Sequence, residues 1–212
     1  TQACLRSGVG KVTVHTPELN NNILQTAVPE AVLSLDKHPK VFTSPVRTDA
    51  FDAIAIGPGI GTGKETALAF IEQVSHVAVP VVFTPHPGEM QKLGICRHDS
   101  FSMLLEAVNL CRRHQFYIIF KGHHSAVCTP EGKVFFNTTG NSGMGTAGSG
   151  DVLTGIVTAL LAQHYPMLDA CRMGVYLHGL AGDIAAEKLG EHSVTAHDII
   201  AALPQAFRKL TL

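Results

Sequence analysis

The sequence has no excess of charge of either sign and no long apolar run, and both absences exclude broad classes of function. Sixteen Lys and Arg residues stand against seventeen Asp and Glu residues, which gives a formal net charge of −1. This balance leaves no basic footprint for nucleic acid or for an anionic membrane surface. No apolar run is long enough to span a bilayer, and the first residues show no signal-peptide pattern. We therefore expect a cytoplasmic protein that binds neither nucleic acid nor membrane.

The cysteines and histidines lack the spacings of redox and metal sites. The five cysteines are odd in number, and no two of them form a CxxC pair. This pattern favours a reducing compartment in which thiols act as small apolar side chains. The twelve histidines are scattered, without HExxH or another zinc-binding spacing. We therefore expect ordinary surface and core histidines and no protein-held metal site.

What is present indicates a single α/β domain over residues 1–212. Hydrophobic residues make up 45% of the chain and charged residues 16%, as in a globular protein with a real core. Apolar β-branched runs alternate with helical patterns, which predicts a mostly parallel sheet covered by helices. The expected strands lie at 11–15, 31–34, 52–56, 79–84, 117–121, 126–129 and 134–137. The expected helices lie at 64–74, 102–114, 151–163, 168–189 and 196–208. The last two strands form a hairpin at a sheet edge.

The most informative segment is 140–151, Gly-Asn-Ser-Gly-Met-Gly-Thr-Ala-Gly-Ser-Gly-Asp, which runs directly into an apolar helix pattern. Free N–H groups at a helix start bind anions, and glycine lets a phosphate approach the backbone closely. Asp151 would stand where a hydroxyl attacking that phosphate must lose its proton. We therefore interpret the segment as a phosphoryl-transfer site with Asp151 as the base. In the alternative interpretation Asp151 only caps the helix, but capping alone does not require five glycines.

Three further loops of ligand-binding type follow expected strands. Residues 57–63, Gly-Pro-Gly-Ile-Gly-Thr-Gly, satisfy neither the GxGxxG nor the Walker pattern, and a tight turn is the alternative. Two prolines stiffen residues 84–89, Thr-Pro-His-Pro-Gly-Glu, which favours a ligand-facing role for His86. Residues 121–125, Lys-Gly-His-His-Ser, offer a nucleotide phosphate a cation and an accessible backbone, or form only a charged strand end. Since open α/β sheets bind ligands at the carboxyl ends of strands, these loops are expected to share one site.

Together these segments resemble the ribokinase-like superfamily and, within it, the ADP-dependent NAD(P)H-hydrate dehydratase family. The matching pieces are residues 51–62, 83–94, 120–156 and 174–190, and similarity continues through 195–208. The combination of GPGIG, TPHPGE and GNSGMGTAGSGDVL is far more specific than any one of them. The resemblance implies a three-layer αβα sandwich whose central sheet is mostly parallel, with an antiparallel edge hairpin.

The resemblance also implies a reaction. Its substrate would be hydrated NADH or NADPH (NADHX or NADPHX), whose C6 hydroxyl is phosphorylated by ADP or ATP. Phosphorylation turns hydroxide, a poor leaving group, into a good one, and the enamine nitrogen of the ring helps to expel phosphate. Mg²⁺ would screen the phosphates, with ligands mostly from phosphate and water. The family further implies a homo-oligomer, often a tetramer, and a link to an NAD(P)HX epimerase.

Residue roles follow from the matching positions of the family. Asp151 would take the proton of the C6 hydroxyl. The transferring phosphoryl group would lie against the N–H groups of Ala147, Gly148, Ser149 and Gly150. The nucleotide would contact Lys121, Gly122, His123, His124, Ser125 and Gly150. The hydrated dinucleotide would contact Gly59, Gly61, His86, Glu89, Asn141 and Asp151.

The sequence departs from the family pattern at two places. A glycine- and alanine-rich segment that precedes the region around residue 1 in the family is absent. The second place is near residues 82–83. In the family, one strand is followed there by a βα unit and then by another strand. In this sequence the first of these strands runs directly into the last. Parallel neighbours need a crossover of about a dozen residues. Either the unit has been deleted, or residues are missing from the sequence at this point, and we favour the second interpretation.

Two other functions remain open at this stage. A ribokinase-like kinase of a hydroxyalkyl heterocycle would need the same base and the same anion-binding loop. A protein that has truly lost a βα unit could instead bind nucleotide without catalysis. The amino-acid sequences of the TPHPGE motif and of the glycine-rich loop favour the dehydratase over the kinase. The presence of Asp151 argues against a non-catalytic protein.

Overall fold

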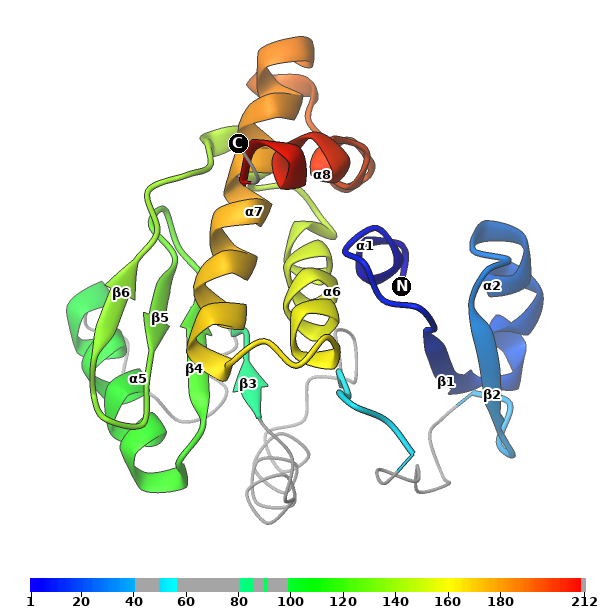
Figure 1. The fold of residues 1–212 in the computed structure, drawn as a ribbon, viewed down its shortest axis with the longest axis horizontal. Coiled ribbons are helices and arrows are strands. Elements are labelled where there is room, and N and C mark those ends of the chain that lie inside the picture. The colour runs from blue at the N-terminus through cyan, green and yellow to red at the C-terminus, as the bar shows by residue number, and fades with distance from the viewer. Residues whose placement is uncertain (41–49, 57–80, 86–89, 91–98, 211–212) are drawn as a thin grey trace.

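The C-terminal half of the chain builds a four-stranded mixed sheet with helices on both faces (Figure 1). The structure is a computed structural model, and it describes residues 1–40, 50–56, 81–85, 90 and 99–210. The strands β3, β4, β5 and β6 follow this order in the sheet, at Val82–Phe83, Tyr117–Phe120, Ala126–Cys128 and Val134–Phe136. β3 and β4 are parallel, whereas β4–β5 and β5–β6 are antiparallel. The expected edge hairpin is confirmed, and its turn uses Gly132 at a φ of 81°.

Strand β4 is apolar throughout because both of its faces are covered. Successive side chains of a strand point to opposite faces. Ile118 and Phe120 pack against α5 (Ser100–His114) on one face. Ile119 packs on the other face against α6 (Ser149–Ala162) and α7 (Met167–Leu189). This arrangement gives the three layers expected from the resemblance.

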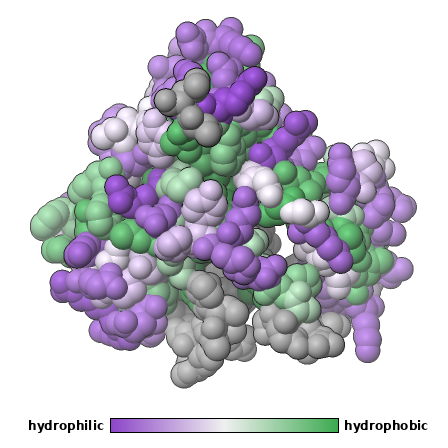
Figure 2. Space-filling model, in the orientation of Figure 1, coloured by the Kyte–Doolittle hydropathy of each residue, from purple (hydrophilic) through white to green (hydrophobic). Residues whose placement is uncertain are grey.

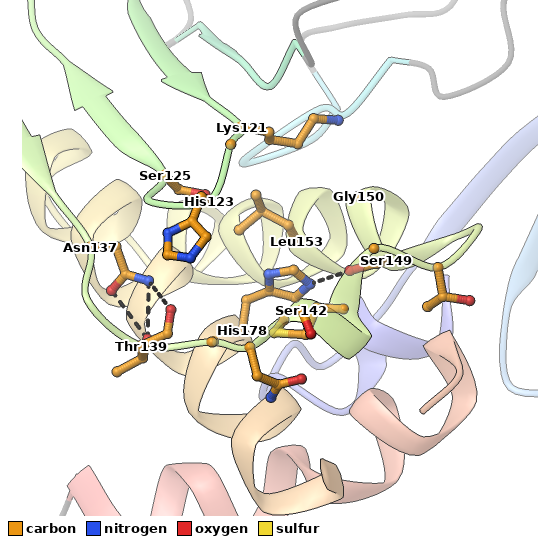
Figure 3. A pocket seen from close by; sticks show the side chains of 17 residues that line it. Lys121, His123, Ser125, Asn137, Thr139, Ser142, Ser149, Gly150, Leu153 and His178 are labelled. Carbon is orange, nitrogen blue, oxygen red and sulfur yellow. Dashed lines mark hydrogen bonds between the residues drawn. The ribbon is translucent and has the colours of Figure 1, made fainter. Parts of the chain in front are cut away.

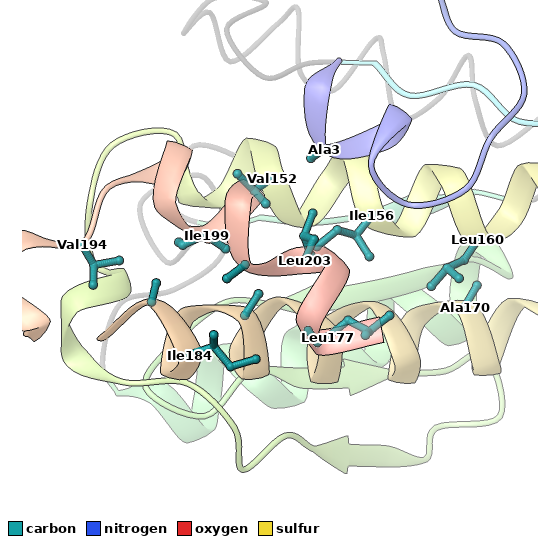
Figure 4. Close-up of a cluster of buried hydrophobic side chains, with 14 residues drawn as sticks. Ala3, Val152, Ile156, Leu160, Ala170, Leu177, Ile184, Val194, Ile199 and Leu203 are labelled. Atoms are coloured by element: carbon teal, nitrogen blue, oxygen red, sulfur yellow. The ribbon is translucent and has the colours of Figure 1, made fainter. Parts of the chain in front are cut away.

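Helices α6 and α7 continue into a second core with α8 (Ala196–Leu210), shown in Figure 4. Ile156 and Leu160 of α6 meet Leu177 of α7 and Leu203 of α8 in this cluster. The short α1 (Gln2–Leu5) lies on α6, where a Cβ at Gly155 would be 2.9 Å from the Cβ of Ala3. The layer therefore consists of closely packed helices on which the segment 137–149 can be supported.

The N-terminal part contains a separate parallel pair of strands. β1 (Thr13–Pro17) pairs with β2 (Val32–Asp36), and between them lie a 3₁₀ turn η1 (Glu18–Asn20) and helix α2 (Asn21–Ala27). Within the part of the chain described, the strands thus form two sheets. The turn and α2 were not expected from the sequence, because their residues show no apolar periodicity; none of them is buried.

One predicted strand is wrong. Residues 52–56 were expected to form a buried strand, but they have no strand structure, and Ile56 is 49% exposed. An apolar run becomes a strand only where another strand pairs with it. The expected helix 64–74 lies outside the described residues. The remaining expected strands and helices are found, with ends that differ by a few residues.

The surface and the cysteines agree with the composition. On the face seen in Figure 2, hydrophobic residues show in places between hydrophilic ones. No described helix is long and apolar enough to cross a membrane. The cysteines at 4, 111, 128 and 171 are free and buried, as expected of apolar packing side chains, and Cys96 lies outside the described residues. Burial raises the pKa of Cys111 and of Cys171 to about 12.

Candidate active site

A cavity of about 530 Å³ opens beside the carboxyl end of β4 (Figure 3). Its walls come from the segment that follows β4, from the loop between β6 and α6, from the first turns of α6 and from the middle of α7. The segment 121–125 and the glycine-rich loop 140–150 therefore meet in one site. Of the residues expected in these two segments, Lys121, Gly122, His123, Ser125, Asn141, Ser149 and Gly150 line the cavity.

The glycine-rich loop leads into the start of α6, where no side-chain cap is found among the described residues. Gly148 is the N-cap residue of α6 at a φ of 85°, a left-handed conformation that glycine adopts at no steric cost. The N-cap residue Gly148 has no side chain to cap the helix, and Asp151 is the third residue of α6, in its first turn. The N-cap position itself is therefore taken by Gly148 and not by Asp151.

Three N–H groups of this loop remain available to a ligand. The amides of Asp151 and Val152 donate to the carbonyl of Gly148, and the amide of Ser149 donates to that of Thr146 at 3.3 Å. Among the described residues, no acceptor is found for the amides of Ala147, Gly148 and Gly150. Three of the four amides expected to face a phosphoryl group are thus unsatisfied by the protein, and such a group at a helix start binds an anion.

The Lys121 side chain lies over the same helix start. A Cβ at Gly150 would be only 2.8 Å from Lys121 Nζ, so the absence of a side chain at Gly150 makes room for the ammonium group. The positive end of the α6 dipole and a lysine are brought together there. Both favour an anion in the cavity, as a nucleotide phosphate would be.

The loop that begins at Thr84 is tied to the helix of Asp151. Thr84 Oγ1 lies 3.1 Å from Thr154 Oγ1, and the amide of Lys121 donates to the carbonyl of Pro85 at 3.1 Å. Thr154 is one turn after Asp151, whose side chain is exposed and does not line the cavity. The start of the expected substrate loop is thus held between the base and the nucleotide segment. His86, Glu89, Gly59 and Gly61 lie outside the described residues.

Helix α7 supplies two polar residues that our sequence analysis did not single out. His178 Nε2 lies 3.2 Å from Ser149 Oγ, the contact drawn as a dashed line in Figure 3. Asp183 accepts hydrogen bonds from the amide of Gly140 and from Asn141 Nδ2, both at 2.9 Å. The sequence signal for both is the segment 178–183, His-Gly-Leu-Ala-Gly-Asp, which lies within the matching segment 174–190.

The glycines of α7 let the loop between β6 and α6 approach the helix closely. A Cβ at Gly179 would collide with Thr139, and one at Gly182 would collide with the Met144 side chain. Asn141 then begins a 3₁₀ turn (Ser142–Met144), where its Oδ1 accepts from the amide of Gly143 at 3.1 Å. The loop is therefore held against α7 by packing and by hydrogen bonds.

The imidazole of His178 is neutral at physiological pH. Burial lowers the pKa of His178 to about 4; the charge of Lys121 also lowers this pKa, whereas a hydrogen bond to the Ser149 backbone raises it. Within the ranges that the structure describes, no three His, Cys, Asp or Glu side chains lie close enough to share a metal ion.

Comparison with known proteins decides the family. The family model described as NAD(P)H-hydrate dehydratase matches residues 1–82 and 66–205. This chain belongs to the NAD(P)H-hydrate dehydratase family. Family membership covers the cavity, the glycine-rich loop and helices α6 to α8, and it agrees with the resemblance drawn from the motifs.

Individual relatives carry the same description. The ADP-dependent (S)-NAD(P)H-hydrate dehydratase of Enterococcus faecalis is 32% identical over 236 residues, which cover 99% of this chain and 78% of the relative. The bifunctional NAD(P)H-hydrate repair enzyme Nnr of Moorella thermoacetica is 34% identical over 242 residues, with 98% and 46% covered. This chain thus spans less than half the length of that bifunctional relative.

A solved structure shows the same fold. The ADP/ATP-dependent NAD(P)H-hydrate dehydratase of Bacillus subtilis, co-crystallised with ATP and Mg²⁺, superposes with a TM-score of 0.82. The match covers 98% of this chain and 82% of that one, at 24% identity. The three-layer α/β fold of the family is therefore confirmed for this chain.

Proposed function

We propose that this protein dehydrates hydrated NADH or NADPH, using ADP or ATP to phosphorylate the C6 hydroxyl and then releasing phosphate. One observation carries the proposal: Gly150 and Lys121 line one cavity at the start of α6, where the amides of Ala147, Gly148 and Gly150 have no acceptor among the described residues, and Asp151 lies in the same helical turn. Such a site binds a phosphate and offers a base for the attacking hydroxyl. Membership of the dehydratase family supplies the identity of the substrate.

The base acts first in this mechanism. Asp151 accepts the proton of the C6 hydroxyl as the oxygen attacks the terminal phosphorus of the nucleotide. Its residue is exposed and does not line the cavity, which supports an approach of the second substrate from the solvent side of α6. His86, Glu89, Gly59, Gly61 and Asn141 are proposed to hold that substrate.

The phosphoryl group is stabilised by the loop and by Lys121. The amides of Ala147, Gly148 and Gly150 donate to its oxygens, and they need no rearrangement because the fold already orients them. Lys121, Gly122, His123, His124 and Ser125 are proposed to bind the nucleotide. After transfer, the phosphorylated C6 position loses phosphate and the reduced nicotinamide ring is restored.

Mg²⁺ is proposed to accompany the nucleotide and to screen its negative charge. The described residues fit this role, because they offer no metal cage of their own and Lys121 lies beside the phosphate position. Phosphate oxygens and water are the ligands that Mg²⁺ prefers when a protein supplies few carboxylates.

The wider setting is also a proposal. The Moorella relative is a bifunctional NAD(P)H-hydrate repair enzyme of which this chain spans 46%, and this supports a link with an NAD(P)HX epimerase. A homo-oligomer, with a tetramer as the family form, is tested by light scattering of the purified protein. The cytoplasmic location stays a prediction from the cysteine pattern.

The decisive experiment offers NADHX, ADP and Mg²⁺ to the full-length protein and to Asp151→Asn. Recovery of NADH is followed by its absorbance, and phosphate release is measured in the same reaction. We expect turnover in the native protein and its loss by at least ~10²-fold in Asp151→Asn, with ADP binding retained.

The outcomes separate the three functions. A product that keeps its phosphate, on a hydroxyalkyl heterocycle, would identify a kinase. Tight ADP binding with no turnover of either substrate would identify a non-catalytic nucleotide-binding protein. Equal turnover in Asp151→Asn would remove Asp151 from the role of base.

A further inference from the structure

The residues at the start of α6 that carry the unsatisfied amides have short side chains or none, so few side-chain contacts fix their orientation. Two of the four residues at 147–150 are glycines, which lose more conformational entropy on ordering than any other residue. Ala147 has only a methyl group, and no side chain caps α6. Ser149 is the one residue of the four with a polar side chain, and it is 6% exposed. Its contacts therefore have a large share in fixing how this helix start is oriented.

The Ser149 hydroxyl is bound by a residue of a rigid neighbouring helix. His178 Nε2 lies 3.2 Å from Ser149 Oγ, across 29 positions of sequence. The residues around His178 are firmly packed, since Leu177 and Gly179 are buried and Gly179 touches Thr139. Figure 3 shows the His178 ring directed at Ser149 from the α7 side of the cavity. The ring thus connects the helix start of α6 to a part of the fold that does not move independently.

We propose that His178 is a positioning residue for phosphoryl transfer, which holds Ser149 and thereby fixes the orientation of the neighbouring amides of Ala147, Gly148 and Gly150 at the start of α6. The proposal rests on the proposed function, because it concerns the same phosphate position. His178 acts through Ser149 and transfers no proton itself. A misplacement of about 1 Å in such a site lowers the rate by roughly 10²-fold, so a tether of this kind has a measurable effect.

The protonation state of His178 fits a positioning role. Burial and the neighbouring Lys121 keep its imidazole neutral at physiological pH. A neutral ring binds the serine hydroxyl without adding a second cation beside Lys121 that would compete for the phosphate. The other end of the loop is held in a similar way by Asp183, which binds Gly140 and Asn141.

The test compares substitutions that keep or remove the Nε2 contact. His178→Gln places an amide at the position of Nε2, whereas His178→Asn reaches only the position of Nδ1 and His178→Leu has no polar atom. We expect kcat to fall by about 10- to 100-fold in the Asn and Leu variants and to stay within about threefold of the native value in the Gln variant. His164→Gln, an exposed histidine after the far end of α6, is the matched control.

A double-mutant cycle with Ser149→Ala separates positioning from general stability. If His178 acts through the Ser149 hydroxyl, His178→Leu has little further effect on kcat once that hydroxyl is gone. A loss that is equally large in both backgrounds would overturn the proposal, and so would equal impairment of the Gln and Leu variants. Thermal unfolding of each variant shows that the compared proteins are folded, and the comparison of Gln with Asn does not depend on the Leu variant.

Binding of ADP with Mg²⁺, measured by calorimetry, gives a readout that does not depend on the dehydratase reaction. We expect the affinity to weaken in the order native, Gln, Asn, Leu. If the native protein binds ADP but does not act on NADHX, the proposed function fails while this order still supports the tether. Unchanged affinity in all variants, together with unchanged kcat wherever turnover is seen, would overturn it.

Discussion

At the scale of single residues, the site combines groups that the sequence marks clearly with others that only their surroundings reveal. Gly148 and Gly150 stand out in the sequence, and each has a definite physical task. Gly148 adopts a left-handed conformation, and Gly150 leaves room for Lys121 Nζ. His178 is marked in the sequence only by its place in the matching segment 174–190, and its importance comes from its contact with Ser149. A lone histidine in a helix cannot be separated from an ordinary core histidine without its neighbours.

The lowered pKa of His178 predicts a pH dependence of stability. The folded protein holds this histidine neutral down to a pH of about 4, whereas its ordinary pKa in the unfolded chain is 6.5. Between these values the unfolded chain binds a proton that the folded protein does not, so the free energy of unfolding decreases as the pH falls. From pH 7 to pH 5 this single group lowers stability by about 2 kcal/mol.

Urea unfolding of the native protein and of His178→Gln at pH 7 and at pH 5 checks this prediction. The Gln variant is expected to lose less stability on acidification than the native protein. His164→Gln should show the native pH dependence, because that side chain is 79% exposed. Parallel curves for all three proteins would mean that His178 is protonated in the folded state at pH 5.

At the scale of elements, the close contact of α6 and α7 is determined by small residues. A Cβ at Gly174 would lie 2.5 Å from Val157 Cγ2, a stiff β-branched side chain that cannot move aside. Gly174→Ala is therefore expected to lower the free energy of unfolding by about 1–2 kcal/mol, because overpacking outweighs the gain of about 1 kcal/mol in helix propensity.

Chemical denaturation measures the free energy of unfolding of Gly174→Ala, and two further variants test whether the collision with Val157 is the cause. Gly10→Ala is the matched control, since no atom lies within 4 Å of its added Cβ. Val157→Ala removes the colliding atom, so the cost of Gly174→Ala should largely disappear in that background. A stabilising effect of Gly174→Ala in the native background would show that the two helices can separate without cost.

The expected starts of the last three strands, at 117, 126 and 134, are confirmed, and the expected helix starts among the described residues differ from the observed ones by at most two residues. Thr195 and Asp198 form one half of a capping box at the start of α8, in which Asp198 Oδ2 accepts from the amide of Thr195 at 2.9 Å. The reciprocal half differs, because the Thr195 hydroxyl donates to the same carboxylate. These bonds lower the pKa of Asp198. Helix α2 was not predicted, and the strand expected at 52–56 was predicted wrongly, because a strand forms only where a partner strand, often distant in sequence, pairs with it.

At the scale of the whole molecule, the region around residues 82–83 remains the main open prediction. The Moorella relative aligns over 242 residues, although this chain has only 212, and the family model matches in two parts that overlap at 66–82. Both findings support residues that are present in relatives and missing from this sequence in the region around residues 82–83.

Peptide mapping of the natural protein tests this directly. We expect no peptide in which Val82 is followed immediately by Phe83, and instead two peptides joined by an additional βα unit. A single peptide that contains Pro80-Val81-Val82-Phe83-Thr84 would show a true deletion. In that case the non-catalytic function gains weight, because a parallel sheet would have lost one of its crossovers.

The sequence by itself determined the class of fold, the glycine-rich loop and the residues that can bind a phosphate, because these depend on local patterns and on backbone freedom at glycine. It also indicated the edge hairpin, whose turn needs Gly132 at positive φ. The tertiary structure alone decided which amides stay unsatisfied, and it placed Lys121 over Gly150 and His178 against Ser149. Those relations join segments far apart in the chain, and only the packing of α7 against α6 and the sheet brings them together.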